Sequence, residues 1–395
     1  MKNFVFLSPN FPDNYWNFCL RLKENGMNVL GIGDCPYDQL ADHLKGALNE
    51  YYKVSSLENY DEVYRAVAFF IHKYGRVDWL ESNNEYWLER DARLREDFNI
   101  ATGFRPADMP CVKCKSLMKQ RYALAGIPVA RYHMVDDMDG CAAFIAEVGY
   151  PVIVKPDNGV GAVSTYKIST PEELAGFFAM KDDNVYIMEE FIDATVNSYD
   201  AIVDSHGEPL FETGNVTTIS LMDVVNELGN SCFYIRNKLP EDMRERGRAA
   251  LKAFGVKSRF VHFEFFRLNQ DQHIGKKGEV VALEVNMRPS GGISPSMMNY
   301  ANGTDVYKIW ADMIAFDSTQ KGCSNSQYCV FAGRRDHRHY VLSRDEVLRI
   351  YGHCIREAER VDPALATDMG DYMFLACFDT EEELNAFIRA VFEEV

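Results

Sequence analysis

Acidic and amide side chains interrupt two apolar, strand-like runs within residues 259–292, RFVHFEFFRL and VVALEVNMRPSGG. Because side chains alternate along a strand, Glu284, Asn286 and Arg288 are expected to share one face. Glu264 lies in a similar run of Phe and Val, and a carboxylate in such surroundings costs free energy unless a cation or donor compensates it. The opposite face of the second run would carry the apolar residues Val281, Leu283, Val285 and Met287.

Two carboxylates and one amide oxygen are hard oxygen ligands, which suit Mg2+ arriving with the phosphates of a nucleotide. The alternative is two salt-bridged strand glutamates on a solvated sheet face. The spacing E-x-N-x-R at the end of an apolar strand favours the metal site.

A second group of residues is suited to binding phosphate. Lys155 ends the apolar strand PVIVKP, where a buried ammonium needs an anion nearby. The turn DNGVGAVST follows, and Gly159 and Gly161 let backbone amides approach a phosphate closely. No G-K-[ST] follows, so this is not a Walker loop. YIMEEFI then places Glu189 and Glu190 at a strand end, where the backbone could bind an adenine edge.

Strands alternating with helices in the first 110 residues predict a parallel α/β domain. The expected strands and helices there are 3–7, 14–25, 27–32, 60–74, 77–81 and 85–97. Beyond residue 321, the series 327–334, 343–356, 372–378 and 380–393 predicts a small α/β piece ordered strand, helix, strand, helix. The expected domains are therefore 1–110, 111–320 with a smaller subdomain at about 113–187, and 321–395.

Composition narrows the function classes. A net charge of −17 over 395 residues argues against a nucleic-acid partner, which would call for a basic stripe. Ten scattered cysteines do not form the pattern of a disulfide framework. No apolar run approaches the roughly 20 residues of a membrane span, and the N-terminus has no signal-peptide pattern. We expect a cytoplasmic protein with no membrane partner.

Taken in order, five segments resemble the motifs of the ATP-grasp superfamily, and within it the carboxylate–amine ligases. The segments are CKSLMKQRYALAGIPVARY, GYPVIVKPDNGVGAV, YIMEEFI, FEFF and LEVNMRPSGG. The resemblance covers about residues 111–320. It implies an α/β (α+β) fold in which an ATP-grasp domain follows an N-terminal parallel α/β domain and precedes a small C-terminal α/β subdomain.

The resemblance also implies roles for individual residues. ATP would be held at its phosphates by Lys115 and Lys155 under a closing loop at residues 157–164. Arg288 would lie beside the carboxylate that is phosphorylated, so Arg288 and Lys155 are the expected catalytic residues. The other nucleotide contacts would come from Asn158, Gly159, Gly161, Glu189 at the adenine amine, and the backbone of Glu190 and Ile192. Two Mg2+ ions, or Mn2+ in their place, would be bound by Glu264, Glu284 and Asn286.

The implied reaction is ADP-forming carbon–nitrogen ligation through an acyl phosphate. The substrates would be an acid and an amine, plausibly amino-acid-like. A homodimer is compatible with the resemblance. One departure concerns the ribose: Val196 stands where family members often have an acid, with Asp200 as the nearest substitute. Arg334 and Arg335 are candidates for binding a substrate carboxylate. The alternative is that they lie in a charged surface turn. The alternatives are a biotin-carboxylase-like or purine-pathway ligase, or a nucleotide-binding regulatory protein that has lost turnover.

Overall fold

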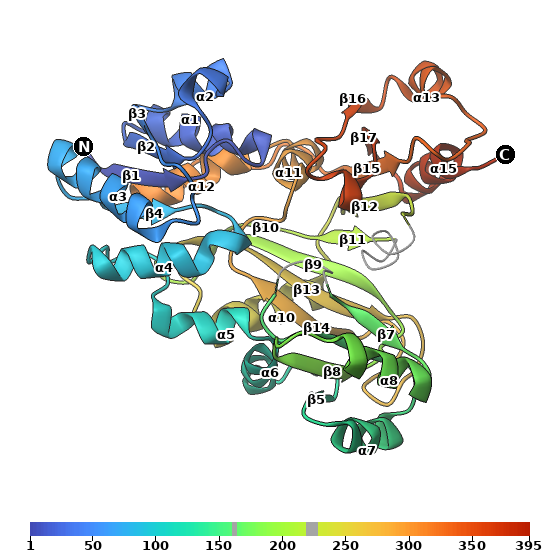
Figure 1. Ribbon diagram of the computed structural model, residues 1–395. Helices are drawn as coiled ribbons and strands as arrows, with labels where there is room; N and C mark the ends of the chain where they lie inside the picture. The colour runs from blue at the N-terminus through green and yellow to red at the C-terminus, as the bar shows by residue number, and fades with distance from the viewer. Residues whose placement is uncertain (160–163, 219–227) are drawn as a thin grey trace.

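Three β-sheets and the helices around them make up the computed structural model, which describes residues 1–159, 164–218 and 228–395 (Figure 1). The fold is mixed α/β, as predicted. None of the helices in the described ranges is long and apolar enough to cross a membrane.

The first sheet is entirely parallel and has the order β3-β2-β1-β4. Its strands are β1 (Asn3–Leu7), β2 (Asn28–Gly33), β3 (Glu50–Lys53) and β4 (Trp79–Glu81). The surrounding helices are α1 (Trp16–Glu24), α2 (Asp42–Ala47), α3 (Tyr60–Tyr74) and α4 (Leu88–Asp97). The predicted parallel α/β arrangement is thus confirmed. All parallel strands end at the same edge of the sheet, where the loops after β1 and β4 carry polar residues.

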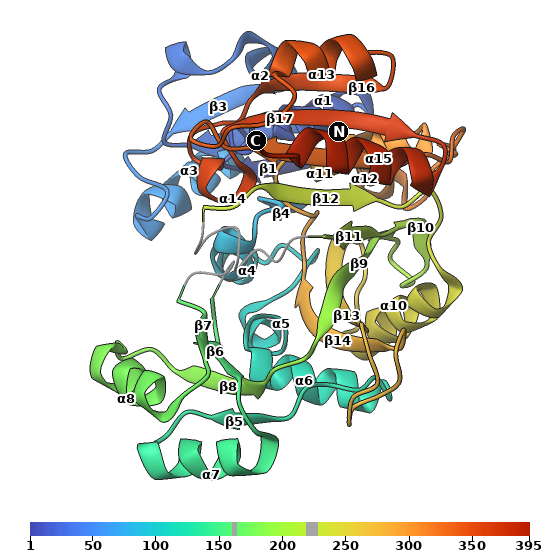
Figure 2. The ribbon, with the colours of Figure 1, turned by 90° about the vertical axis from the view of Figure 1, so that its right-hand side faces the viewer.

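A second, antiparallel sheet has the order β5-β8-β6-β7. Helices α7 and α8 pack on it through a separate apolar core. Figure 2 shows this unit at the end of the molecule opposite the C-terminal strands. The elements are β5 (Tyr132–Met134), α7 (Met138–Val148), β6 (Val152–Pro156), β7 (Tyr166–Ile168), α8 (Pro171–Met180) and β8 (Tyr186–Glu190).

The third and largest sheet is antiparallel and has the order β14-β13-β9-β11-β12-β15-β17-β16, with β10 paired to β9. The first part of the sheet comprises β9 (Ala194–Val203), β10 (Pro209–Thr213), β11 (Asn215–Thr217), β12 (Ser231–Ile235), β13 (Arg259–Leu268) and β14 (Val280–Asn286). The C-terminal strands β15 (Tyr328–Arg334), β16 (Ile355–Arg360) and β17 (Tyr372–Phe378) continue it without a break, because β12 pairs with β15.

Helices cover this sheet and join it to the first one. The helix α12 packs beside α1, and Trp310 on it contacts the rings of Phe4 and Phe18. The remaining α-helices of the described residues are α5 (Met109–Lys113), α6 (Lys115–Leu124), α10 (Glu241–Ala253), α11 (Ser294–Asn302), α12 (Val306–Phe316), α13 (Arg344–Tyr351), α14 (Ala366–Met369) and α15 (Glu381–Phe392). The domain boundaries at residues 110 and 320 stay predictions, although apolar contacts cross them.

Two local expectations were wrong. The helix predicted over 343–356 ends at Tyr351, and β16 begins at Ile355. IREAER is a solvated edge strand, and its charges resemble those of an exposed helix end. Within β14 the pairing with β13 skips Leu283, so the alternation of faces reverses there. Val281 consequently lies in a different apolar cluster from Val285 and Met287.

Candidate active site

The acids of β13 and β14 lie directly opposite each other. Glu264 pairs with Glu284 across the two strands, and His262 pairs with Asn286. The two glutamate side chains are 27% and 23% exposed, so they are partly sheltered yet still reachable by a ligand. Glu284 and Asn286 share one face of β14, as predicted, because the bulge lies before them. Three oxygen donors therefore meet on one face of two paired strands.

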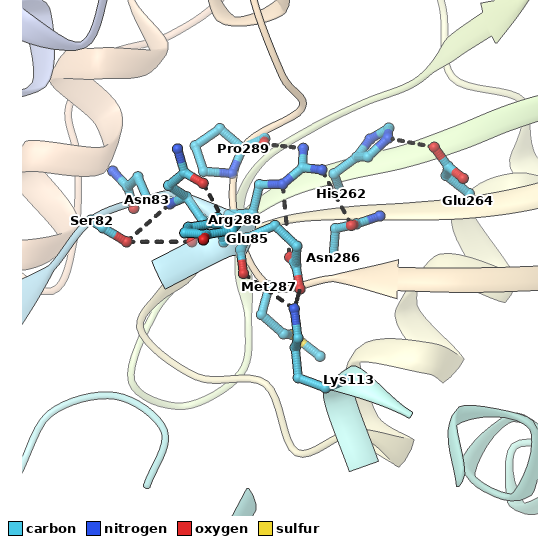
Figure 3. Close-up of polar contacts among 12 residues, drawn as sticks. Ser82, Asn83, Glu85, Lys113, His262, Glu264, Asn286, Met287, Arg288 and Pro289 are labelled. Atoms are coloured by element: carbon cyan, nitrogen blue, oxygen red, sulfur yellow. Dashed lines mark hydrogen bonds and ion pairs between the residues drawn. The ribbon is translucent and has the colours of Figure 1, made fainter. Parts of the chain in front are cut away.

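A buried histidine links these acids to the next strand. His262 Nδ1 lies 2.7 Å from Asp200 Oδ1. His262 Nε2 lies 3.1 Å from Glu264 Oε1 (Figure 3). Burial alone would lower the pKa of His262, but Asp200 and Glu264 outweigh it and raise that pKa to about 9. Burial likewise opposes ionisation of Glu264, yet His262, Arg288 and Lys155 hold its pKa below the usual range. Glu264 is therefore an anion at neutral pH.

Asp200 cannot supply the ribose contact considered from the sequence. Its side chain is fully buried and is already bonded to His262 and to the hydroxyl of Ser198. Val196 lies in β9 opposite Phe266. Neither residue offers a free acid at the expected place.

A cluster of cations faces the acids from the second sheet and α6. Lys119 and Lys155 each lie 3.1 Å from Glu189, and all three residues are buried. Burial would raise the pKa of Glu189, but the two lysines outweigh it and lower that pKa to about 2. Burial would lower the pKa of Lys155, whereas Glu189, Glu284 and Glu264 raise it. Lys155 is thus a charged ammonium between the two groups of carboxylates.

The start of α6 is tied to the loop that follows β6. Asp157 accepts hydrogen bonds from the amide and hydroxyl of Ser116, 2.8 and 2.9 Å, and its carbonyl accepts from the amide of Lys115. Lys115 Nζ consequently lies 3.2 Å from the carbonyl of Gly159 and 3.7 Å from Glu284. The two lysines predicted to bind phosphate therefore both lie near Glu284.

Only part of the predicted phosphate loop lies within the described residues. Cys114 forms a β-bridge with Asn158, which places that residue beside the start of α6. Gly161 and the neighbouring positions of the 157–164 loop lie outside the described residues. The role of this loop stays a prediction.

The predicted adenine residues lie on and just after β8. The Glu190 carboxylate accepts from the Arg131 guanidinium at 2.8 and 2.9 Å, and the Glu190 amide donates to the Arg131 carbonyl. Ile192 is buried two residues further on. Because Glu189 is paired with two lysines, the adenine contacts assigned to this segment stay predictions.

Arg288 lies at the junction of the first and third sheets. Its Nη2 donates to Asn286 Oδ1 at 3.2 Å and its Nη1 to the Pro289 carbonyl at 2.8 Å. Its Nε lies 3.8 Å from Glu85 Oε2, in the turn after β4 (Figure 3). An arginine two residues after Asn286 thus reaches into the N-terminal α/β unit.

Two charged residues that contact the candidate site, Lys119 and Glu85, were not predicted from the sequence. A signal existed for both: Lys119 is one turn after Lys115, and Glu85 follows a parallel strand in the polar run ESNNE. Residues after the carboxyl end of a parallel strand commonly face a ligand.

Arg334 and Arg335 are neither surface residues nor part of this site. Both are buried. Arg334 donates to the carbonyls of Val391 and Leu342, and Arg335 donates to the carbonyls of Gly229 and Thr367. They hold backbone segments together around β15.

No protein-family model matches the chain. Over 240 residues, 58% of this chain, it is 26% identical to an L-arginine-specific L-amino acid ligase of Bacillus subtilis. That match covers 56% of the relative, so the chain spans just over half of its length. The fold matches the crystal structure of an L-amino acid ligase from Bacillus licheniformis with a TM-score of 0.70 at 15% identity, covering 99% of this chain and 97% of that one. The chain thus has the fold of such a ligase, as the resemblance to the ATP-grasp superfamily implied.

A second ATP-grasp structure carries a nucleotide. It is the biotin carboxylase domain of the Hydrogenobacter thermophilus 2-oxoglutarate carboxylase, described in complex with MgADP and bicarbonate. Its TM-score is 0.71 at 16% identity, covering 98% of this chain and 89% of that chain. The ATP-grasp fold alone therefore does not separate amino acid ligases from biotin carboxylases.

The oxygen donors of this chain fit a divalent cation. Glu264 is held ionised, Glu284 is partly open, and the Asn286 oxygen is shared only with Arg288 in the described structure. Carboxylate and amide oxygens are the ligands that Mg2+ accepts together with phosphate. The residues present are thus suited to a metal-bound nucleotide.

Proposed function

We propose that the protein is an ATP- and Mg2+-dependent ligase that phosphorylates a substrate carboxylate and joins the acyl group to an amine. The observation that carries this proposal is the convergence of the paired acids Glu264 and Glu284 with Lys155 and Arg288. A protein that only folds around these charges gains nothing from their burial, since buried ion pairs contribute little net stability.

The two lysines nearest the acids are proposed to hold the phosphates of ATP. Lys155 is charged and buried, and Lys115 is 3.7 Å from Glu284. Phosphoryl transfer depends mostly on positioning and on neutralising charge, which two cations supply without a covalent protein intermediate. Asn158, Gly159 and Gly161 are proposed to cover the phosphates. Glu189, with the backbone of Glu190 and Ile192, is proposed to bind adenine.

Glu264, Glu284 and Asn286 are proposed to hold Mg2+, two ions in all, with Mn2+ as a substitute. The metal would neutralise the β- and γ-phosphates and orient them for in-line transfer. His262 keeps Glu264 oriented and ionised through its 3.1 Å contact. A metal-ligating acid that is fixed by a second hydrogen bond loses less entropy on binding.

In the proposed reaction a carboxylate oxygen attacks the γ-phosphorus, the bond to the bridging oxygen breaks, and ADP leaves. The amine nitrogen then attacks the acyl carbon, phosphate leaves, and the amine releases a proton. Arg288 is proposed to hold the carboxylate, because its planar guanidinium can bind both oxygens at once. The amides of Gly291 and Gly292 follow and would donate to the developing negative charge.

A biotin-carboxylase-like ligase is the nearest rival, since the fold likeness is equally strong. The sequence match to an amino acid ligase favours the ligase of amino-acid-like substrates. A regulatory protein without turnover is disfavoured by the complete set of acids and cations at the candidate site.

A substrate screen tests the proposal. Purified protein with ATP and Mg2+ is offered single and paired amino acids and small carboxylates, with bicarbonate as a separate arm. Release of ADP and phosphate is measured, and products are identified by mass. Phosphate release stimulated by a pair, with a condensed product, supports the ligase. Stimulation by bicarbonate alone supports the rival, and no stimulation by any acid contradicts both. A homodimer is also proposed, and light scattering tests it.

A further inference from the structure

Three side chains of metal-ligating type meet where the second sheet is joined to α7. His133 on β5, Asp136 in the loop that follows and Cys141 on α7 each bring one donor atom within 4.8 Å of the others. His133 Nε2 lies 2.8 Å from Asp136 Oδ1. An imidazole nitrogen, a carboxylate oxygen and a sulfur therefore converge on one point.

This group lies on the face of the second sheet opposite the candidate active site. Tyr132, the neighbour of His133 on β5, pairs with Glu189 and has its ring centroid 5.7 Å from the ammonium of Lys119. Successive side chains of a strand point to opposite faces, so His133 points away from that lysine. Its ring instead stacks on Phe144 of α7, with 5.9 Å between centroids. The three donors are thus separate from the residues proposed to bind ATP and Mg2+.

The acid of the group is not needed to cap α7. Asp137 is the N-cap residue, and its side chain accepts from the amide of Gly140 at 2.8 Å. Asp136 lies against the Cα of Gly140, where a Cβ atom would come within 2.4 Å of Oδ1 and 2.7 Å of Oδ2. A side chain at position 140 would therefore displace the Asp136 carboxylate from its place beside His133.

An ion can reach these donors from solvent. The side chain of Asp136 is 57% exposed and that of His133 is 29% exposed, whereas Cys141 is fully buried. His133 and Gly140 also line an open depression of about 660 Å³. The group thus combines two donors that face solvent with one sheltered sulfur.

We propose that His133, Asp136 and Cys141 bind one Zn2+ ion, with a water molecule as the fourth ligand. Thiolate and imidazole ligands favour zinc over magnesium. Zinc bonds of about 2.0–2.3 Å put the ligand atoms of a tetrahedral site roughly 3.3–3.8 Å apart. Small side-chain movements bring atoms that already lie within 4.8 Å of one another to this spacing. The thiol proton of Cys141 leaves to solvent when the sulfur binds.

The bound ion would fasten the edge strand β5 to the start of α7. Such a link stabilises the folded chain, because the ligands are not preassembled in the unfolded one. The alternative is an ordinary surface pair of His133 and Asp136 beside a core thiol, which would contribute little. The two interpretations differ in whether the sulfur and the imidazole bind the same ion.

A cobalt titration tests the site, since Co2+ accepts the same nitrogen and sulfur ligands as zinc. The full chain, stripped with a chelator, is titrated with Co2+ in excess Mg2+, which competes at the oxygen donors of the candidate active site. We expect one equivalent to give the thiolate charge-transfer band and the intense visible bands of tetrahedral Co2+. Zn2+ should displace it with a Kd on the order of 1 μM or tighter, and should raise the midpoint of thermal unfolding.

Variants separate the site from the fold. Cys141→Ala should remove the charge-transfer band. His133→Ala and Gly140→Ala should each weaken Co2+ binding at least about 10-fold. Gly140→Ala should not lower the unfolding midpoint of the metal-free chain, since alanine favours a helix. Two controls should match wild type: Gly176→Ala in α8, where an added Cβ atom meets no neighbour within 4 Å among the described residues, and Cys323→Ser at an exposed thiol.

The opposite results overturn the zinc site. A wild-type chain without the charge-transfer band does not bind the ion through a thiolate. A band that survives in Cys141→Ala comes from another cysteine, and unchanged binding in both His133→Ala and Gly140→Ala removes the imidazole and the carboxylate as ligands. Should Cys141→Ala not fold, His133→Ala and Gly140→Ala decide, because neither position lies in the core. None of these measurements depends on ATP turnover, so the zinc site and the proposed function fail separately.

Discussion

Glu284→Gln separates the chemistry of the site from the stability of the fold. The Glu284 side chain is 23% exposed, and its nearest cation, Lys115, is 3.7 Å away. A partly solvated pair of this kind contributes about 0–1 kcal/mol. Tyr122 donates to the backbone carbonyl of Glu284, a bond that the substitution keeps. We therefore expect the free energy of unfolding to fall by no more than about 1 kcal/mol.

ATP turnover should respond very differently. If Glu284 holds Mg2+, the amide replaces an anionic ligand, and we expect kcat to fall by at least about 10²-fold, or roughly 2.7 kcal/mol of activation free energy. The assay is ADP release at increasing Mg2+, alongside urea unfolding. The half-saturating Mg2+ concentration should rise. A folded variant that keeps more than about a tenth of the wild-type rate with an unchanged Mg2+ response would refute the metal assignment.

Three further outcomes follow from the buried charges. Lys155→Met should raise the KM for ATP about 10-fold or more while the fold survives, as measured by ADP release against ATP concentration. Glu81→Gln should cost about 3–5 kcal/mol in urea unfolding, because Glu81 Oε2 accepts from the buried guanidiniums of both Arg95 and Arg259, at 2.8 and 2.7 Å. Glu189 has its pKa lowered from 4.5 to about 2, so its contribution is complete above its ordinary pKa and is lost as the pH falls toward 2. The free energy of unfolding of the wild-type chain should therefore fall between pH 6 and pH 3, and that of Glu189→Gln should fall less.

Wherever strands and helices follow a strong local pattern, the sequence was sufficient. The helix at Tyr60–Tyr74 and the strand at Tyr372–Phe378 lie where periodicity predicts them. The segment Ser294–Phe316 was not anticipated, although it contains α11 and α12. Its apolar residues serve two surfaces at once, the large sheet and α1, so the usual one-sided helical pattern is blurred.

The sequence predicted which residues form the acidic part of the site, but not which of them lie opposite each other. The acids of β13 and β14 were visible because charge inside an apolar strand is unusual. Their direct opposition depends on register, and a bulge at Leu283 shifts that register in a way no alternation rule foresees. The partners Glu85 and Lys119 come from elements distant in sequence, and only folding brings them to Arg288 and Glu189.

The unbroken pairing from β14 through β12 to β15 and β17 limits how this chain can be divided. A fragment cut after residue 320 would leave the amides and carbonyls of β12 exposed along one edge. Such an open edge recruits strands from other molecules, and aggregation is the usual result. The last 75 or so residues thus cover an edge of the large antiparallel sheet, and recombinant fragments of this protein should be expressed with both pieces present.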